Sequence, residues 1–263
     1  YGESCPNPSL RIFPIKEVAD IGRKHGIPLI IDNTAAPVIC RPLEHGAAVV
    51  MHSLTKYIGG HGTTIGGIIV DGGNFDWAAN PKKQPLFNEP DPSYNGAIWG
   101  RDVPKMTGAN VAFAIRARVV LLRDLGAPLS PFNAFQIIQG LETVAIRMKQ
   151  HCANAEKVVK FLETQKKVKN VIYPTNHQGE IRDRAKRYMK GGYGSLVGMD
   201  LGSLEAGSKF IDNLKLLYHV ANIGDARSLA IHPASTTHGQ LNEKQLAEAG
   251  VTPGYVRLSI GLE

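Results

Sequence analysis

The sequence predicts an α/β fold whose first part is built on a mostly parallel sheet. Two apolar runs of strand length, Ile27–Ile31 and Ala47–Val50, each lead into polar residues. Before the first run, residues 14–25 carry apolar side chains at helical spacing, and Gly26 is placed to end that helix. Continuous apolar runs are typical of strands buried on both faces, and helix, strand, short link and strand in this order are typical of a layered α/β sheet.

The elements that follow are predicted from the same patterns. Residues 65–70 form a third strand candidate. Residues 71–102 then lose all periodicity and contain four prolines, and a stretch of that length is either a functional loop or a cover. A helical pattern resumes at Val111. After an interruption at 126–128, Ser130–Pro131 has the form of a helix start, with serine as the N-cap and proline in the first turn.

From Phe132 to about Thr164 apolar residues recur at helical spacing. The residues that define this pattern are Phe135, Ile138, Leu141, Val144, Met148, Cys152, Ala155, Val159 and Leu162. A pattern of that length predicts one bent helix or two, and it is a suitable bridge between domains.

The second half alternates strand candidates with short helices, which predicts an α+β domain. The strand candidates are 168–173, 195–201 and 255–261, and the helix candidates are 204–214 and 243–249. We therefore expect a first domain over residues 1–140 and a second, C-terminal domain over residues 141–263.

The composition is that of a globular protein. Of 263 residues, 43% are hydrophobic and 20% are charged, which is enough for a sizeable core. No apolar run is long enough to span a bilayer, and no signal peptide is recognisable. The three cysteines have no paired spacing, so we expect neither disulfides nor a metal site, and we expect a reducing compartment, the cytoplasm.

The net charge of +7 and the pI near 9.3 raise the question of an anionic partner. However, the basic residues are dispersed, with the densest patches at 166–167 and 182–190, and aromatic residues are not interleaved with them. A solvated helix face and a small anionic ligand account for the excess charge. We therefore expect no nucleic-acid partner.

The chemically most informative stretch is residues 51–62, directly after the second apolar run. It presents the hydroxyls of Ser53 and Thr55 and the amine of Lys56 at the end of a buried strand, ahead of several glycines. Burial favours the neutral amine, and a neutral lysine can attack an aldehyde carbon to form a Schiff base. The neighbouring hydroxyls are suitable donors to a phosphate. A lone lysine among glycines is more often an exposed loop charge, so this prediction needs support from elsewhere in the chain.

Asp32 gives that support, because it ends the first apolar run. In open α/β sheets ligands bind at the carboxyl ends of strands. An anion at that place can pair with the protonated ring nitrogen of pyridoxal 5′-phosphate (PLP), which then withdraws electrons well. The alternative is a turn or a helix cap. Asp32 and Lys56 at the ends of two successive strand candidates predict a PLP site.

Further candidates lie outside these two strands. Asn7 stands between two prolines, where it is either a turn former or an amide held rigidly toward a ligand. Arg257 interrupts an apolar strand pattern, and it is either an edge-strand arginine facing water or a fork for a substrate carboxylate. His232 and His238 do not have the spacing of a zinc site, so we interpret their segment as a structured loop near the site.

Five motifs together resemble the Cys/Met-metabolism PLP-dependent enzymes. They are DNT at 32–34, SLTKY at 53–57, NIGDA at 222–226, HPAS at 232–235 and VRLSIGLE at 256–263. The motifs stand in the family's order, and the resemblance covers nearly the whole chain. It implies the aspartate-aminotransferase-like fold of PLP-dependent transferases, fold type I. Residues 1–140 would then be part of the PLP-binding large domain, and residues 141–263 would be the small domain.

The resemblance also implies roles for the matching positions. Lys56 would form the Schiff base with PLP and then move protons on the substrate, and Asp32 would pair with the pyridinium nitrogen. Asn7 would bond the 3-oxygen of the ring, and Ser53 and Thr55 would bond the phosphate.

On the substrate side, Arg257 would bind the amino-acid carboxylate and Asn222 would line the same pocket. Within the family, residues 56–67 and the long insertion at 74–100 most resemble O-acetylhomoserine sulfhydrylases, enzymes of methionine biosynthesis. The implied reaction joins O-acetylhomoserine with sulfide, or with a thiol in its place, and gives homocysteine and acetate when sulfide is used. The alternatives are a γ-elimination lyase similar to methionine γ-lyase, a cystathionine γ-synthase-like enzyme, and a non-catalytic PLP-binding fragment.

The ends of the chain lead us to expect a fragment. The first residue is Tyr1 rather than Met, and the chain closes directly after an apolar run. In the family a long stretch precedes the motif at residues 3–8 and supplies the ring stacked on PLP, donors to the phosphate and a tyrosine from a neighbouring subunit. We expect this chain to act only beside that missing N-terminal segment, in a homotetramer as the family suggests.

Overall fold

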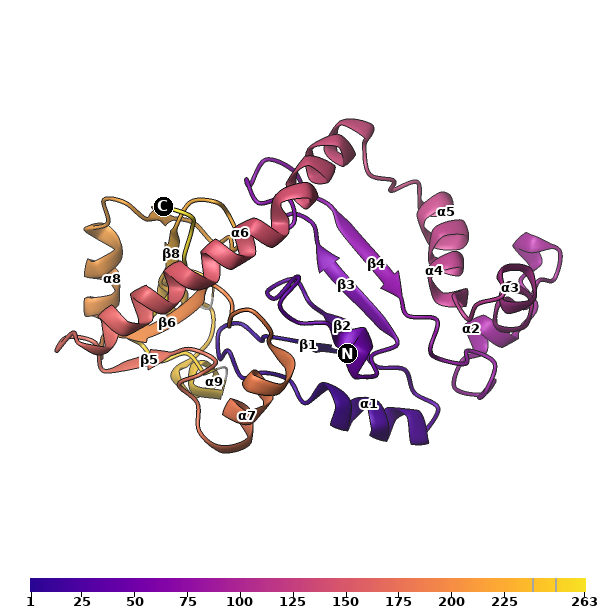
Figure 1. Cartoon of the computed structure of the whole chain (residues 1–263), viewed down its shortest axis with the longest axis horizontal. Helices are drawn as coiled ribbons and strands as arrows, with labels where there is room; N and C mark the ends of the chain where they lie inside the picture. The colour runs from indigo at the N-terminus through magenta and orange to yellow at the C-terminus, as the bar shows by residue number, and fades with distance from the viewer. Residues whose placement is uncertain (238, 249) are drawn as a thin grey trace.

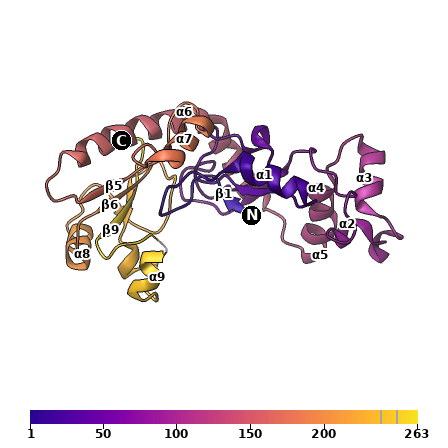
Figure 2. The ribbon, with the colours of Figure 1, turned by 90° about the horizontal axis from the view of Figure 1, so that it is seen from below.

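The computed structural model describes residues 1–237, 239–248 and 250–263. The described strands form one sheet of four strands and one of five, and the long helix α6 (Pro131–Glu163) runs from the first sheet to the second (Figure 1). Seen from below, the C-terminal sheet, the N-terminal sheet and a group of short helices between residues 85 and 125 lie in a row (Figure 2).

The first sheet has the order β1, β2, β3, β4, with bounds Gly2–Glu3, Ile30–Asp32, Val49–Ser53 and Gly67–Asp71. β1, β2 and β3 are parallel, as the sequence predicts. β4, which corresponds to the third strand candidate, is antiparallel to β3. Residues 54–66 connect the two strands without a helix, and a parallel pair usually needs a helical crossover, so the chain simply turns back.

Helix α1 (Ile15–Lys24) confirms the helix predicted before the first strand. Its buried residues Ile15 and Ala19 belong to the same core as Ile31 of β2 and Val50 of β3. The short 3-10 helix η1 (Pro42–His45) forms the link that leads into β3.

The aperiodic segment after β4 is a folded cover. Within it lie α2 (Pro85–Asn88), η2 (Pro92–Tyr94) and the start of α3 (Trp99–Thr107). The helix predicted from Val111 is confirmed by the continuous run of α4 (Ala112–Arg116), the π-helix η3 (Ala117–Leu122) and α5 (Arg123–Leu125). Trp77 lies at the centre of an aromatic cluster, with its ring stacked on Phe113 at a centroid distance of 5.2 Å and tilted against Phe87 at 4.6 Å. The cluster packs on Ala48 and Val49 at the start of β3. Of the two alternatives for this stretch, the structure therefore favours the cover.

Helix α6 is a single helix of 33 residues that begins where the sequence predicts. The Ser130 hydroxyl accepts a hydrogen bond from the Asn133 N–H at 3.1 Å, which is the expected N-cap. Over the first turns the apolar residues of the pattern are not covered, since Phe135, Ile138 and Leu141 are 55%, 56% and 52% exposed. The buried face there contains Gly140 instead, because its lack of a side chain lets the helix approach the loop after β3.

The second sheet has the order β5, β6, β9, β8, β7, with bounds Asn170–Ile172, Leu196–Asp200, Tyr255–Ser259, Leu229–Ile231 and Tyr218–His219. The other elements of this half are α7 (Gly179–Tyr188), α8 (Leu204–Asp212), η4 (Pro233–Ser235) and α9 (Glu243–Glu248). The C-terminal part of α6 packs on this sheet through Ala155, Val159 and Leu162. The strand and helix candidates of the second half are thus confirmed over the described residues, with small shifts at their ends, and residue 249 of the last helix candidate lies outside them.

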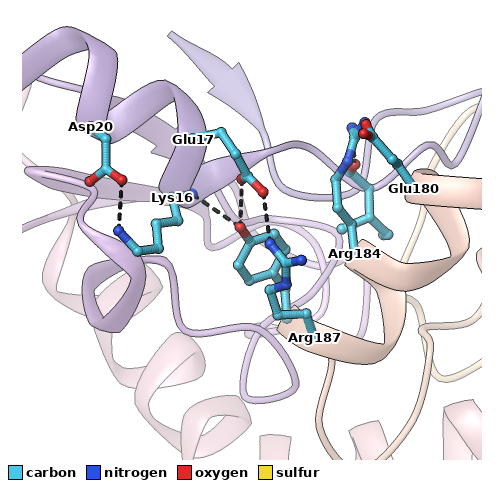
Figure 3. Close-up of polar contacts among 8 residues, drawn as sticks. Lys16, Glu17, Asp20, Glu180, Arg184 and Arg187 are labelled. Atoms are coloured by element: carbon cyan, nitrogen blue, oxygen red, sulfur yellow. Dashed lines mark hydrogen bonds and ion pairs between the residues drawn. The ribbon is translucent and has the colours of Figure 1, made fainter.

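Helix α7 is fastened to α1 by a group of polar contacts (Figure 3). The Glu17 carboxylate accepts hydrogen bonds of 2.7 Å from the Tyr188 hydroxyl and from Arg187. The same hydroxyl accepts a bond from the backbone N–H of Lys16 at 3.2 Å.

Helix α6 contributes to the cores of both halves, so the division near residue 140 falls within one helix and stays a prediction. Among the described residues, no helix is both long and apolar enough to cross a membrane.

Candidate active site

Lys56 lies three residues after β3, in a loop that is half-buried at this position. Its Nζ donates a hydrogen bond of 2.5 Å to the Asn222 side-chain oxygen, 166 residues away in the sequence. Burial, and next the positive charge of Arg257, lower the pKa of the Lys56 amine below its ordinary value. A larger fraction of the amine is therefore neutral and nucleophilic near neutral pH.

Arg257 is on β9, the middle strand of the second sheet. Neighbouring strands pair with β9 on both sides and the side chain is only 8% exposed, so the edge-strand alternative is wrong. One guanidinium nitrogen donates to the backbone oxygen of Asn222 at 2.8 Å, and Nε is buried without a hydrogen-bond partner. Among the described residues no carboxylate lies within ion-pair distance of this guanidinium, so a carboxylate of a ligand would satisfy it.

Asn222 therefore connects the two groups, with its side chain on Lys56 and its backbone on Arg257. It also lines a cavity of about 540 Å³ together with Thr55, the other lining residues being Gly62, Thr63, Thr64, Ile65, Asn133 and Ala221. The Thr55 hydroxyl accepts a bond from the Gly66 N–H at 3.2 Å. Two of the predicted site residues, Thr55 and Asn222, thus line this cavity.

The ends of β2 and β3 meet at one edge of the first sheet. Asp32 is paired with Met51 in the parallel register, so Ser53 lies two residues further along the neighbouring strand. The Ser53 N–H donates to the Thr34 hydroxyl at 2.7 Å, which ties the two strand ends together. One Asp32 oxygen accepts a bond from the Thr34 N–H at 2.9 Å, and the other accepts one from the Tyr1 hydroxyl at 3.2 Å.

Asn7 lies in a segment held between the two halves of the chain. Upstream, the Ser4 N–H donates to the backbone oxygen of Asp32 at 2.9 Å. Downstream, the Tyr255 hydroxyl donates to the backbone oxygen of Pro8 at 2.9 Å, and Tyr255 is on the same strand as Arg257. Asn7 itself is exposed, and its side chain makes no hydrogen bond within the described part of the chain.

His232 has a structural role. Its Nδ1 is 2.8 Å from the Ser235 hydroxyl and its Nε2 is 2.7 Å from the backbone oxygen of Pro253. His238, the other histidine of the predicted loop, lies outside the described residues. Over the ranges that the structure describes, no group of three or more His, Cys, Asp or Glu side chains could hold a metal ion.

Several residues that the sequence did not single out hold the Lys56 loop. Arg147 of α6 donates to the backbone oxygens of Tyr57 and Ile58, and the Tyr57 hydroxyl is 2.7 Å from the Ser195 hydroxyl. The Ala226 N–H donates to the backbone oxygen of Gly60 at 2.8 Å. The sequence held one signal for Arg147, which is a charge among the mostly apolar positions that recur along one side of a long helix.

The arrangement matches a known family. A model of the family described as Cys/Met metabolism PLP-dependent enzyme matches residues 1–263. The chain belongs to this family. This confirms the resemblance carried by the five motifs.

Relatives within the Cys/Met metabolism family are similar over the whole chain. An O-acetyl-L-homoserine sulfhydrylase of Leptospira meyeri is 50% identical over 270 residues, which cover 100% of this chain and 60% of the relative. O-acetyl-L-homoserine sulfhydrylase 1 of Thermus thermophilus is 45% identical, over 99% of this chain and 61% of its own length. A homocysteine synthase of Schizosaccharomyces pombe is 42% identical, with 61% of its length covered. The chain thus spans about three fifths of the length of these relatives.

A solved structure gives the fold. The crystal structure of an O-acetylhomoserine (thiol)-lyase of Campylobacter jejuni superposes with a TM-score of 0.90 at 40% identity, over 99% of this chain and 61% of that one. That structure carries a pyridoxyl-lysine monophosphate. The chain therefore has the α/β fold of the PLP-dependent transferases of fold type I, as the sequence predicts, and PLP is the cofactor of its family.

The residues of this chain fit PLP. The cofactor needs a lysine with a lowered pKa, and Lys56 has one. It needs hydroxyl donors near that lysine, and Ser53 and Thr55 are in the same loop and strand end. Arg257 contacts the backbone of Asn222, and its Nε is buried without a partner. This free nitrogen suits a carboxylate of the substrate.

Proposed function

We propose that this chain is part of a PLP-dependent enzyme that converts O-acetylhomoserine and sulfide to homocysteine and acetate. The observation that carries the proposal is the link from Lys56 through Asn222 to Arg257, which connects a nucleophilic amine to an unpaired guanidinium. The names of the relatives, sulfhydrylases and homocysteine synthases, support the choice of substrate. The relatives' names do not favour the elimination, cystathionine synthase or non-catalytic alternatives.

Five residues hold the cofactor in this proposal. Lys56 binds it through Nζ, and Asp32 binds its ring nitrogen at the carboxyl edge of the sheet. Asn7 donates to the ring oxygen, and Ser53 and Thr55 donate to the phosphate. The bound cofactor supplies an electron sink for negative charge that develops on the substrate.

Two residues hold the substrate. Arg257 binds the α-carboxylate through the guanidinium nitrogens that protein atoms leave free, and burial makes this pair strong because water is excluded. Asn222 orients both groups, because it contacts each of them. With substrate bound, Lys56 Nζ would move protons on the substrate carbons. Contacts at the carboxylate and at the cofactor hold the substrate in one orientation, and much of the rate comes from such positioning.

The larger organisation is also part of the proposal. We assign residues 1–140 to the cofactor-binding domain and residues 141–263 to the C-terminal domain, because each region has its own sheet. We further propose a homotetramer in the cytoplasm, on the grounds of the family resemblance. Light scattering of the purified protein tests the tetramer.

Product analysis tests the reaction. The PLP-loaded full-length enzyme, of which this chain is a part in the proposal, is incubated with O-acetylhomoserine, with and without sulfide. Formation of homocysteine and acetate that depends on sulfide is the expected result. Release of an oxo acid and ammonia at the same rate with and without sulfide would instead assign a γ-elimination lyase, and no consumption of O-acetylhomoserine would contradict the proposal.

A further inference from the structure

Arg147 is a buried arginine on α6 that contacts the backbone of the Lys56 loop. It is 6% exposed. One terminal nitrogen donates to the backbone oxygen of Tyr57 at 2.6 Å. The other donates to Ile58 at 2.9 Å and to Gly140 of its own helix at 2.6 Å. The guanidinium thus holds the two carbonyls that directly follow Lys56.

The charge of Arg147 has no acidic partner within the described residues. Its Nε donates to the Thr143 hydroxyl at 3.1 Å, so every contact that it makes is to a neutral oxygen. Burial lowers the pKa of the guanidinium below its ordinary value. A buried cation is costly unless its hydrogen bonds are well formed, and here the bonds go to backbone atoms of one loop. This arrangement favours a role in fixing that loop.

Two glycines bring helix and loop into direct contact. A Cβ on Gly140 would lie 2.4 Å from the backbone oxygen of Ile58. A Cβ on Gly60, where φ is +77°, would lie 2.4 Å from the Nη1 of Arg147. Side chains at these positions would push α6 away from the loop, so the arginine reaches its two carbonyls only because both residues are glycine.

We propose that Arg147 is a positioning residue for Lys56, because it fixes the backbone that follows the lysine and so directs Nζ toward Asn222. The inference rests on the proposed function of Lys56. The far end of the same loop is fixed by the bond from the Ala226 N–H to Gly60, and Ala226 is four residues after Asn222. With both ends held, the amine and its acceptor stay at 2.5 Å. Loss of Arg147 would free the first of these two anchors.

The test uses the full chain with Arg147→Lys and Arg147→Met, and Lys149→Met as the matched control on the exposed side of the same helix. In the cofactor-free protein, acetic anhydride labelling is followed by mass spectrometry across a pH series, and the exposed Lys160 is the internal reference. We expect the labelling midpoint of Lys56 to rise by about half a pH unit or more in Arg147→Met, because a freed lysine is better solvated. The Lys56 midpoint in Arg147→Lys should lie between those of the parent and of Arg147→Met. The midpoint in Lys149→Met should match that of the parent.

Kinetics of the PLP-loaded protein give a second measurement. We expect kcat to fall about 10- to 100-fold in Arg147→Met with KM little changed, as for a misplaced catalytic group. A lower melting temperature with an unmoved Lys56 midpoint would overturn the proposal, because the role would then be packing alone. Should Arg147→Met not fold, the midpoint in Arg147→Lys decides in the same way. The labelling needs no turnover, so a failure of the proposed reaction would be seen separately.

Discussion

Asn222 contacts the amine on which the proposed chemistry depends. Its side-chain oxygen accepts from Lys56 Nζ, and the pKa of that amine is already lowered by burial and by Arg257. In Asn222→Asp a carboxylate would replace the neutral oxygen and stabilise the ammonium form. We expect the pKa of Lys56 to rise by about 1 unit or more, and the neutral fraction at pH 7 to fall. The labelling midpoint of Lys56 in the cofactor-free protein measures this shift.

The control for this variant is Asn222→Ala, which removes the hydrogen bond without adding a charge. We expect the labelling midpoint of Lys56 not to rise in this variant. An unchanged midpoint in Asn222→Asp would mean that the contact between Lys56 and Asn222 does not persist in solution, and the link between amine and guanidinium would be lost with it.

Substitution of Arg257 should affect substrate binding and leave cofactor binding nearly unchanged. In Arg257→Ala the substrate carboxylate loses its buried partner, and we expect binding to weaken by about 2–5 kcal/mol. Binding of PLP should stay close to that of the parent, because no cofactor contact is assigned to this residue. Substrate titration and cofactor retention measure the two effects, with Arg182→Ala on the exposed face of α7 as the control. Loss of cofactor in Arg257→Ala would show that the assigned role is wrong.

At the scale of single residues, the sequence indicated site residues where a residue type is unusual for its position. Lys56 after a buried strand and Arg257 within an apolar strand are such cases, and the structure places both in contact with Asn222. Arg147 was missed because the apolar periodicity of α6 was counted without its polar interruptions. The burial of a charge against backbone carbonyls depends on a tertiary contact between residues 90 positions apart. A propensity or a spacing does not contain that contact.

At the scale of elements, the join between α1 and α7 predicts a pH dependence of stability. Although burial alone raises the pKa of Glu17, the hydrogen bonds from Tyr188 and Arg187 outweigh it, and the pKa lies below its ordinary value. A carboxyl whose pKa is lowered by folding stabilises the fold above its unfolded pKa, and the contribution is lost as pH falls through the folded value. We expect Glu17→Gln to lower the melting temperature at pH 7 but much less near pH 3.

The matched control is Glu44→Gln, since Glu44 pairs with Arg41 at an exposed site. Exposed pairs of this kind contribute about 0–1 kcal/mol, so we expect only a small change in melting temperature at pH 7. Equal effects of the two variants at pH 7 would contradict the idea that Glu17 fastens α7 to α1.

Helix α6 shows which property of an element a pattern predicts. Its start and end followed from the serine cap and the length of the periodic run. Its buried face did not, because Phe135, Ile138 and Leu141 are exposed in this chain while Gly140 faces the Lys56 loop. Apolar residues identify a helix, but the neighbours decide which of them are covered.

For the whole molecule, the sequence predicted two sheet-containing regions, the parallel core of the first and the position of the main site at the strand ends. The antiparallel direction of β4 was not predicted, because strand patterns carry no direction and the lack of a helical crossover in the glycine-rich link of residues 54–66 was not taken into account. For residues 71–102 the sequence left two alternatives, a functional loop or a cover, and the aromatic cluster of the structure favours the cover. Its stability comes from contacts of Trp77 with rings that are distant in sequence, which local periodicity does not reveal.

Reduction with borohydride tests the central assignment most directly, because it fixes the cofactor on the amine to which it is bound. The full chain is loaded with PLP, reduced and digested, and the modified peptide is sequenced by mass spectrometry. The account predicts one modified lysine, Lys56, and no modification in Lys56→Ala. A phosphopyridoxyl group on another lysine, or an equal yield in Lys56→Ala, would contradict it.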